Sequence, residues 1–76
     1  MAKFAWTTIM AREFESLVPM SDDQRVVFRD MVNGKSIVHT ATTHNMSTRK
    51  VDNIRQWIKI MYKEVQIYTP LLPEWK

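Results

Sequence analysis

The sequence predicts an all-α fold of four or five helices in a single domain, and three observations predict it. Apolar residues recur at spacings of three and four, which place them on one face of a helix. Only one glycine and three prolines occur among 76 residues, too few for the many tight turns of a small sheet. No cysteine is present, so disulfides and thiolate metal sites are excluded and packing must hold the domain together.

The N-terminal segment, residues 1–17, is expected to form the first helix, beginning at about residue 2. Its apolar stripe consists of Trp6, Met10, Phe14 and Leu17, with Ile9 beside it. Pro19 marks the end of the helix, because the residue before a proline is disfavoured in helical geometry.

A scaffold helix is expected over residues 21–33. Ser21 and Gln24 fit a capping box, in which each side chain bonds to the backbone N–H of the other residue. Two aspartates in the first turn suit the positive end of the helix dipole. Gly34 follows the helix, where the left-handed conformation that glycine adopts easily is common. The expected buried residues are Val27, Phe28, Met31 and Val32.

Residues 36–68 are expected to hold a short helix, a turn and a long last helix. Ser36 caps the short helix at residues 37–43, and Asn45 can take positive φ in the turn. Ser47 or Thr48 caps the last helix, which runs to about residue 67. Its apolar stripe is Val51, Ile54, Ile58, Met61, Val65 and Tyr68.

An irregular tail is expected over residues 69–76, which contain two of the prolines. The pair Leu71-Leu72 and the nearby Trp75 are unusual in such a tail. They dock either back on the domain or onto a partner, and the sequence does not choose between these alternatives.

Positive charge is concentrated in one segment of the chain, although the formal net charge is only +3. Residues 34–63 carry six basic residues and one acidic residue, whereas residues 1–33 carry four basic and five acidic residues. A concentrated basic segment favours a polyanion as the partner. The alternative is a solvated helix face.

Residues 36–58 have the layout of a helix-turn-helix, with a short helix, a turn and a capped second helix. Ala41 is small enough to let the two helices cross closely. Met46 fills the corner between them, and Ser47 caps the helix whose first turn would enter the major groove of DNA. The motif therefore predicts a domain that binds duplex DNA.

A combination of residues spread over a little over half of the chain, from Met20 to about Tyr62, strengthens this interpretation. They are Ser21, Arg25, Val27, Phe28, Met31, Gly34-Lys35-Ser36, Ala41, Asn45-Met46-Ser47, Val51-Asp52-Asn53 and Ile58. This pattern resembles the DNA-binding domains of the LuxR/GerE regulators and the related region 4 of bacterial sigma factors. The resemblance implies a tetrahelical fold that binds duplex DNA through the second helix of the motif.

Three positions depart from the usual pattern of these families. Thr40 stands where a large aliphatic residue is usual, and Asn45 where glycine is common. Asp52 stands where LuxR-type domains usually have a basic residue that contacts DNA. An aspartate there repels phosphate but can accept a hydrogen bond from a cytosine amino group.

The polar face of the last helix supplies most of the predicted DNA contacts. The side chains expected to reach base edges are Thr48, Arg49, Asn53 and Gln56. Asparagine and glutamine can pair with adenine, and arginine with guanine. The side chains expected to bind phosphate, which gives affinity but little sequence choice, are Lys35, Lys50, Arg55 and Lys59. The alternative is that all of these are only the solvated residues of an amphipathic helix.

The resemblance further implies a homodimer formed through the last helix, since dimers match palindromic operators. The expected dimer interface is Met61, Val65 and Tyr68, with Trp57, Ile60 and Tyr62 beside it. The alternative is that this stripe packs on the first two helices, because a small domain needs its best helix in its core.

Other classes of function lack their characteristic residues. His39 and His44 are a poor metal pair on a helix, with no cysteine or clustered carboxylate nearby, so no metal is expected. Paired carboxylates, an activated nucleophile and a glycine-rich phosphate loop are all missing, so neither enzyme activity nor a cofactor is expected. No apolar run approaches the roughly 20 residues of a membrane span, and no signal-peptide pattern is present, so a cytoplasmic protein is expected.

The first hypothesis is a small bacterial or phage transcription regulator that reads the major groove with the helix starting near Ser47. The second is an adaptor or anti-activator on the same scaffold that binds a transcription factor, a sigma factor or RNA polymerase. A DNA-packaging or recombination accessory protein would use the same motif. The first hypothesis predicts one continuous basic face that joins Lys35, Arg49, Lys50 and Arg55, whereas the second predicts an exposed apolar patch.

Overall fold

The computed structural model describes residues 5–75, which form four α-helices followed by one 3-10 turn. In chain order these elements are α1 (Thr8–Leu17), α2 (Asp22–Val32), α3 (Ile37–Thr43), α4 (Thr48–Val65) and the 3-10 helix η1 (Gln66–Tyr68). No strand occurs in these residues. The predicted all-α class is confirmed.

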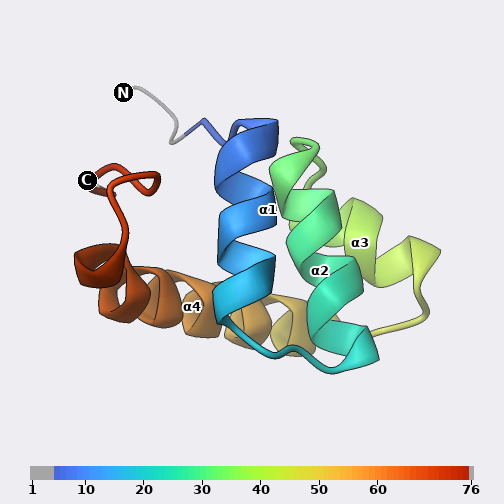
Figure 1. Ribbon diagram of the computed structural model, residues 1–76. Helices are drawn as coiled ribbons and strands as arrows, with labels where there is room; N and C mark the ends of the chain where they lie inside the picture. Colours follow the sequence, from blue (N-terminus) through green and yellow to red (C-terminus); the bar gives the residue numbers. More distant parts are fainter. Residues whose placement is uncertain (1–4, 76) are drawn as a thin grey trace.

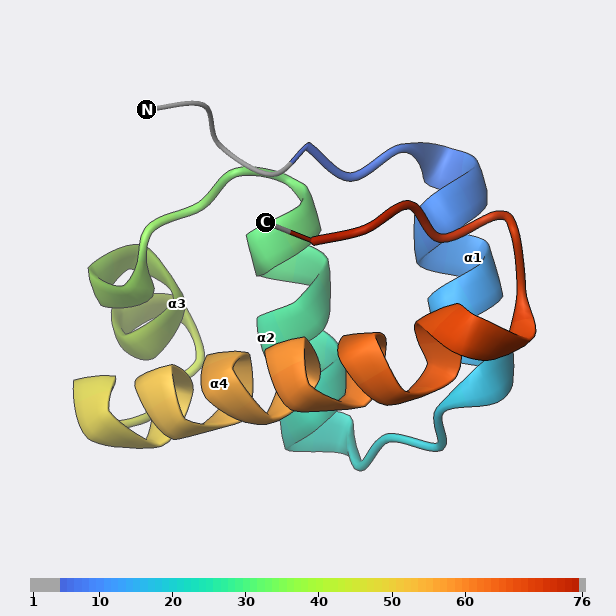
Figure 2. The same ribbon diagram turned by 90° about the vertical axis from the view of Figure 1, so that its left-hand side faces the viewer.

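The longest helix, α4, organises the arrangement. Figure 1 shows α1 and α2 side by side, with α4 crossing below both of them. In Figure 2, turned by 90°, α3 lies beside the first turns of α4. The buried face of α4 packs against α1, α2 and α3, so it lies at the centre of the core. None of the helices in residues 5–75 is both long and apolar enough to cross a membrane.

Each helix begins with a hydroxyl side chain that accepts a hydrogen bond from a backbone N–H three residues on. The predicted caps Ser21, Ser36 and Ser47 do so, at 3.3, 3.0 and 3.0 Å. Gln24 completes the predicted capping box by accepting from the Ser21 N–H at 2.9 Å. These caps explain why the predicted bounds of α2, α3 and α4 agree with the structure to within about two residues.

The predicted start of the first helix is wrong within the described residues. The helix begins at Thr8, because the extended Thr7 caps it through a bond from the Met10 N–H at 3.2 Å. Residues 1–4 of the predicted helix lie outside the described part. The prediction that Ile9 and Leu17 belong to the buried stripe is also wrong, since Ile9 is 63% exposed and Leu17 is 41% exposed. Met10 and Phe14 are the buried residues of α1, and Val18 continues their face just beyond the helix.

Five aromatic side chains form the centre of the domain, and we refer to them as the aromatic cluster. They are Trp6, Phe14, Phe28, Tyr62 and Trp75. Trp6 packs edge-to-face on the other four, with ring centroids 5.0 to 5.9 Å apart. Such contacts stabilise by about 0.5–1.5 kcal/mol each beyond the area that they bury. The cluster therefore joins the segment before α1, all three long helices and the tail.

The predicted stripe of α4 is only partly correct. Val51 and Ile58 are buried, but the next fully buried residue is Tyr62, which was expected beside a dimer interface. The predicted spacing followed a seven-residue repeat, whereas a straight α-helix drifts by about 20° per heptad against such a repeat. The buried face of α4 therefore includes Tyr62. By contrast, Tyr68 lies in η1 and is 78% exposed.

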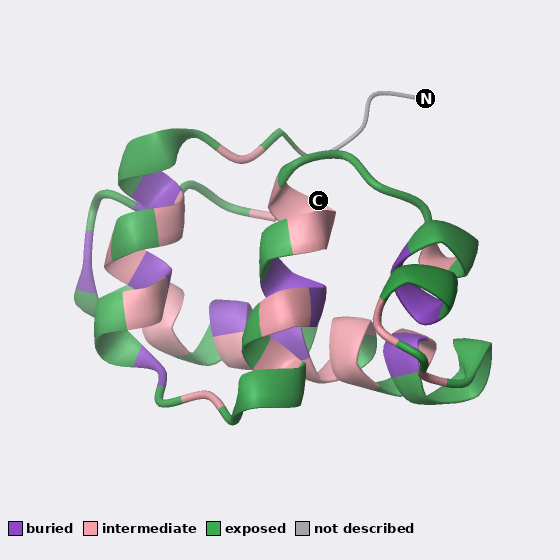
Figure 3. Cartoon of the chain, turned by 90° about the vertical axis from the view of Figure 1, so that its right-hand side faces the viewer, coloured by how far each residue is buried: buried purple, intermediate pink, exposed green. Residues whose placement is uncertain are grey.

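The tail after η1 is irregular, as predicted, and it docks on the domain. Leu72 is only 3% exposed, and the Tyr62 hydroxyl donates a hydrogen bond to the Pro73 carbonyl. Trp75 packs against Tyr62 at a centroid distance of 5.2 Å. Figure 3 shows the buried residues on the inward sides of the helices and on the tail. Of the two alternatives left open by the sequence, docking back on the domain is therefore the one that Leu72 and Trp75 follow, while Leu71 stays half-exposed.

Replacement of Gly34 by alanine is expected to lower the free energy of unfolding by about 1–2 kcal/mol. Gly34 has φ +78°, and an added Cβ would meet no atom within 4 Å, so the cost comes from backbone conformation alone. Urea unfolding measures the change, and Gly34→Asn serves as the control because asparagine tolerates this conformation better than alanine. A Gly34→Ala protein with an unchanged midpoint would contradict the explanation.

The two adjacent leucines of the tail provide a matched pair of variants. Leu72→Ala should lower the free energy of unfolding by about 2–4 kcal/mol, because it opens a cavity in the core. Leu71→Ala should change it by less than about 0.5 kcal/mol, because Leu71 is 49% exposed. Denaturant unfolding of both variants tests the docking of the tail, and equal effects would argue against it.

Candidate nucleic-acid interface

The helix-turn-helix predicted from the sequence is formed by α3, the turn at residues 44–46 and α4. The Met46 N–H donates to the Ala41 carbonyl at 2.9 Å, and Asn45 between them has φ +54°. Ala41 is only 6% exposed and allows α3 to approach α4 closely. Asparagine is among the few residues besides glycine that adopt positive φ readily, so it can replace glycine at this corner.

Two polar contacts involve α3 and the turn after it, one within the helix and one to α2. Thr40 is fully buried, and its hydroxyl donates to the Ser36 carbonyl at 3.2 Å. This bond explains how a threonine fits where a large aliphatic residue was expected, since a buried hydroxyl needs a partner. On the other side of the turn, the His44 Nε2 lies 3.2 Å from a carboxylate oxygen of Asp30 on α2. The turn is thereby joined to the scaffold helix.

The outer face of α4 carries the side chains predicted to reach bases. Thr48, Arg49 and Asn53 are exposed, and their side chains form no hydrogen bond or ion pair within the described residues. Gln56 is also exposed and donates to the carboxylate of Asp52, one turn earlier, at 2.8 Å. The structure therefore brings the four predicted side chains to the first half of one helix, next to the turn.

The four residues of the predicted basic face are divided between two depressions, since Lys35 and Arg55 line one, and Arg49 and Lys50 line the other. The Lys50 ammonium lies 2.5 Å from the Asp23 carboxylate, in the first turn of α2. Arg55 instead donates to the Lys35 carbonyl, just beyond the other end of α2. Because α2 has 11 residues and an α-helix rises about 1.5 Å per residue, these two contacts lie at opposite ends of a long helix.

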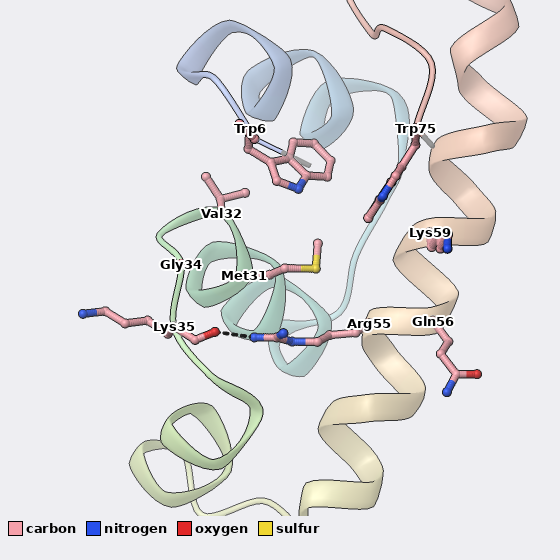
Figure 4. Close-up of a pocket in the computed structure, with 10 residues that line it drawn as sticks. Trp6, Met31, Val32, Gly34, Lys35, Arg55, Gln56, Lys59 and Trp75 are labelled. Atoms are coloured by element: carbon pink, nitrogen blue, oxygen red, sulfur yellow. Dashed lines mark hydrogen bonds between the residues drawn. The ribbon is translucent and has the colours of Figure 1, made fainter. Parts of the chain in front are cut away.

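Arg55 has a structural role that the sequence did not predict. Its guanidinium Nη2 donates to the Lys35 carbonyl at 2.5 Å, which ties α4 to the loop between α2 and α3 (Figure 4). Burial lowers the pKa of Arg55, while the nearby carboxylates of Asp30 and Asp52 oppose this effect. The guanidinium stays charged at neutral pH.

Two residues that were not expected there lie beside the predicted face. A shallow depression of about 450 Å³ next to Arg49 and Asn53 is also lined by Gln24 and Trp57. Gln24 belongs to the first turn of α2, and nothing in the local sequence indicates that it approaches α4. Trp57 was expected at a dimer interface but is half-buried against the core.

Within residues 5–75, no group of three or more histidine, cysteine, aspartate or glutamate side chains could hold a metal ion. His39 is exposed on α3, and His44 contacts a single carboxylate. Comparisons of the chain with protein families, with curated proteins and with solved structures find no match. Inferences about function therefore rest on the geometry and chemistry of these residues.

Proposed function

We propose that this chain binds duplex DNA in a sequence-specific way, with the first half of α4 in the major groove. The observation that carries the proposal is the helix-turn-helix, whose second helix exposes Thr48, Arg49 and Asn53 next to the turn. In this motif the second helix reads base edges while the first crosses the backbone. The resemblance to LuxR/GerE domains and sigma factor region 4 supports the same assignment.

Each exposed side chain of α4 suits one kind of DNA contact. Arg49 can donate two hydrogen bonds to guanine, and Asn53 can pair with adenine. Gln56 is held by Asp52, so the two side chains would contact DNA together, with the Asp52 carboxylate able to accept from a cytosine amino group. On α3, the first helix of the motif, His39 is exposed and would be available for contact with the DNA backbone that such a helix crosses.

The proposed biological role is regulation of transcription in a bacterium or a phage. Such a protein binds a short operator. It then either recruits RNA polymerase or a sigma factor to the promoter or excludes them from it. Of the four phosphate-binding candidates, Lys50 alone is held in an ion pair with a described carboxylate, and Lys35 and Lys59 are exposed.

Binding to duplex DNA across a salt titration tests the proposal. With a random-sequence duplex, log K is expected to fall linearly with log salt concentration, because phosphate contacts release counterions. On a duplex selected for tight binding, Arg49→Ala should weaken binding by about 1–3 kcal/mol and relax the preference at one base pair. Fluorescence anisotropy of labelled duplexes measures both quantities.

Arg12→Ala is the matched control, because Arg12 is an exposed arginine on α1 and its removal changes the net charge equally. It should leave the selected duplex bound almost as tightly as the wild-type protein does. Equal losses for the two variants would indicate attraction by net charge without a specific face. Absence of binding even at low salt would exclude the proposed function.

A second candidate function, a protein-binding adaptor, is favoured by one observation. Three apolar residues with large exposed fractions lie at and after the end of α4, namely Ile67 at 77%, Tyr68 at 78% and Leu71 at 49%. Exposed apolar side chains close together in the chain are typical of protein contacts. Capture of purified RNA polymerase or a sigma factor by the immobilised protein, without DNA binding, would favour this function.

We further propose that these apolar residues pair two copies of the chain when it binds DNA. Met61 and Val65, two members of the predicted interface, are half-buried against the core, whereas Tyr68 is exposed. We therefore place the proposed interface at η1 and the residues beside it, and not on the apolar stripe of α4. A symmetric pair would place two α4 helices on the two halves of a palindromic operator.

Sedimentation velocity over a range of protein concentrations tests the dimer. The wild-type protein should shift from monomer to dimer as its concentration rises, and Tyr68→Ser should keep it monomeric without loss of folding. Val38→Ser on α3 is the control, because Val38 is 64% exposed but lies away from η1. A wild-type protein that stays monomeric at all concentrations would rule out the dimer.

A further inference from the structure

A cleft of about 580 Å³ opens on the side of α4 that faces the α2–α3 loop and the tail. Its volume lies within the range of roughly 300–1,000 Å³ that is usual for small-molecule sites. It is bounded by the segment before α1, the end of α2, the side of α4 and the end of the tail (Figure 4). The cleft is separate from the depression beside Arg49 and Asn53.

The walls of the cleft are mainly aromatic and apolar. Trp6 and Trp75 contact each other edge-to-face at one end, with ring centroids 5.9 Å apart and planes at 88°. Met31 and Val32, at the end of α2, line the opposite side (Figure 4). Both tryptophans are held in the aromatic cluster, so these walls are part of the folded core and do not need a ligand to form.

The charge in the cleft is positive. Arg55 and Lys59 reach it from α4, and no acidic side chain of the described residues lines it. The Lys59 ammonium lies 5.9 Å from the centre of the Trp75 ring, at the edge of the cleft. Lys35 contributes its backbone, because its side chain points away and its carbonyl faces Arg55 (Figure 4).

Arg55 also retains an unused hydrogen-bond donor. Its Nη2 is bonded to the Lys35 carbonyl, but its Nε is buried without a hydrogen-bond partner among the described residues. A buried donor without a partner is costly, and a charged one more so. Because the Nε is buried, an anionic acceptor in the cleft would bond instead to the part of Arg55 that lines it, and would also compensate the charge of Lys59.

We propose that the cleft binds a small planar aromatic carboxylate. The ring system would lie against Trp6 and Trp75, and the carboxylate would accept hydrogen bonds from Arg55 and Lys59. Aromatic walls with two cations select a ligand that is both apolar and anionic, because an anion adds to the partial compensation that Asp30 and Asp52 give Arg55 and that the Trp75 ring gives Lys59. Gln56 and Lys59 line the cleft and are also predicted DNA contacts, whereas Arg49 and Asn53 lie beside the other depression.

Titration of the ¹⁵N-labelled protein with 2-naphthoate, followed by NMR, tests the proposal. The indole N–H signals of Trp6 and Trp75 should shift, whereas that of Trp57, which lies at the other depression, should not. The neutral analogue 2-naphthamide should bind about tenfold more weakly, because it lacks the charge-assisted hydrogen bonds. Shifts confined to Trp57, or equal affinity for the two compounds, would overturn the proposal.

Lysine variants separate a specific cation from the net charge of the protein. Lys59→Gln should weaken the binding of 2-naphthoate by about fivefold to tenfold, in line with loss of one charged partner. Lys63→Gln, one turn further along α4, removes the same charge outside the cleft and should leave the affinity unchanged. Equal losses in both variants, or no saturable binding by the wild-type protein, would exclude the site.

Discussion

The fold depends on the packing of Trp6 on four other aromatic rings. Trp6 is not part of a helix, yet its ring contacts α1, α2, α4 and the tail through Phe14, Phe28, Tyr62 and Trp75. A 76-residue chain without cysteine has little else with which to fix the relative positions of its helices. The large area that each ring buries, together with the edge-to-face geometry, makes this cluster the main source of cohesion in the domain.

The cluster determines where the candidate sites lie, because it fixes α4 through Tyr62. With Tyr62 buried, the opposite side of α4 must face outwards, and that side carries Arg49 and Asn53. Between these two sides, Arg55 and Lys59 line the cleft beside the tryptophans. One helix thus contributes to the core, to the proposed DNA-reading face and to the proposed ligand site, with Gln56 and Lys59 belonging to both proposed sites. This arrangement follows from the 3.6-residue period of an α-helix once a single buried residue has been placed.

The local elements could be predicted from the sequence, whereas contacts between distant residues could not. Serine caps and the glycine after α2 give strong local signals, so α2, α3 and the start of α4 were predicted closely. The start of α1 was missed because Trp6 has the right spacing for a helical stripe but reaches the core from an extended segment. The contacts of Lys50 with Asp23 and of Arg55 with the Lys35 carbonyl join residues 27 and 20 positions apart, which no periodicity reveals. For this reason the sequence identified the basic residues Lys35, Arg49, Lys50 and Arg55, but it could not predict that they lie on different sides of the domain.

This separation of the basic residues links the proposed DNA binding to the proposed dimer. With Lys50 paired to Asp23 and Arg55 bonded to a carbonyl, one copy of the domain keeps few cations to place on phosphates. Since each phosphate contact contributes to affinity through counterion release, a single copy would bind DNA weakly even with good base contacts. Two copies joined near η1 would double the phosphate contacts, and the second half-site would be bound at a high effective concentration. In the proposed dimer, the exposed Ile67 and Tyr68 would form the contact that lets a domain with so few free cations bind an operator.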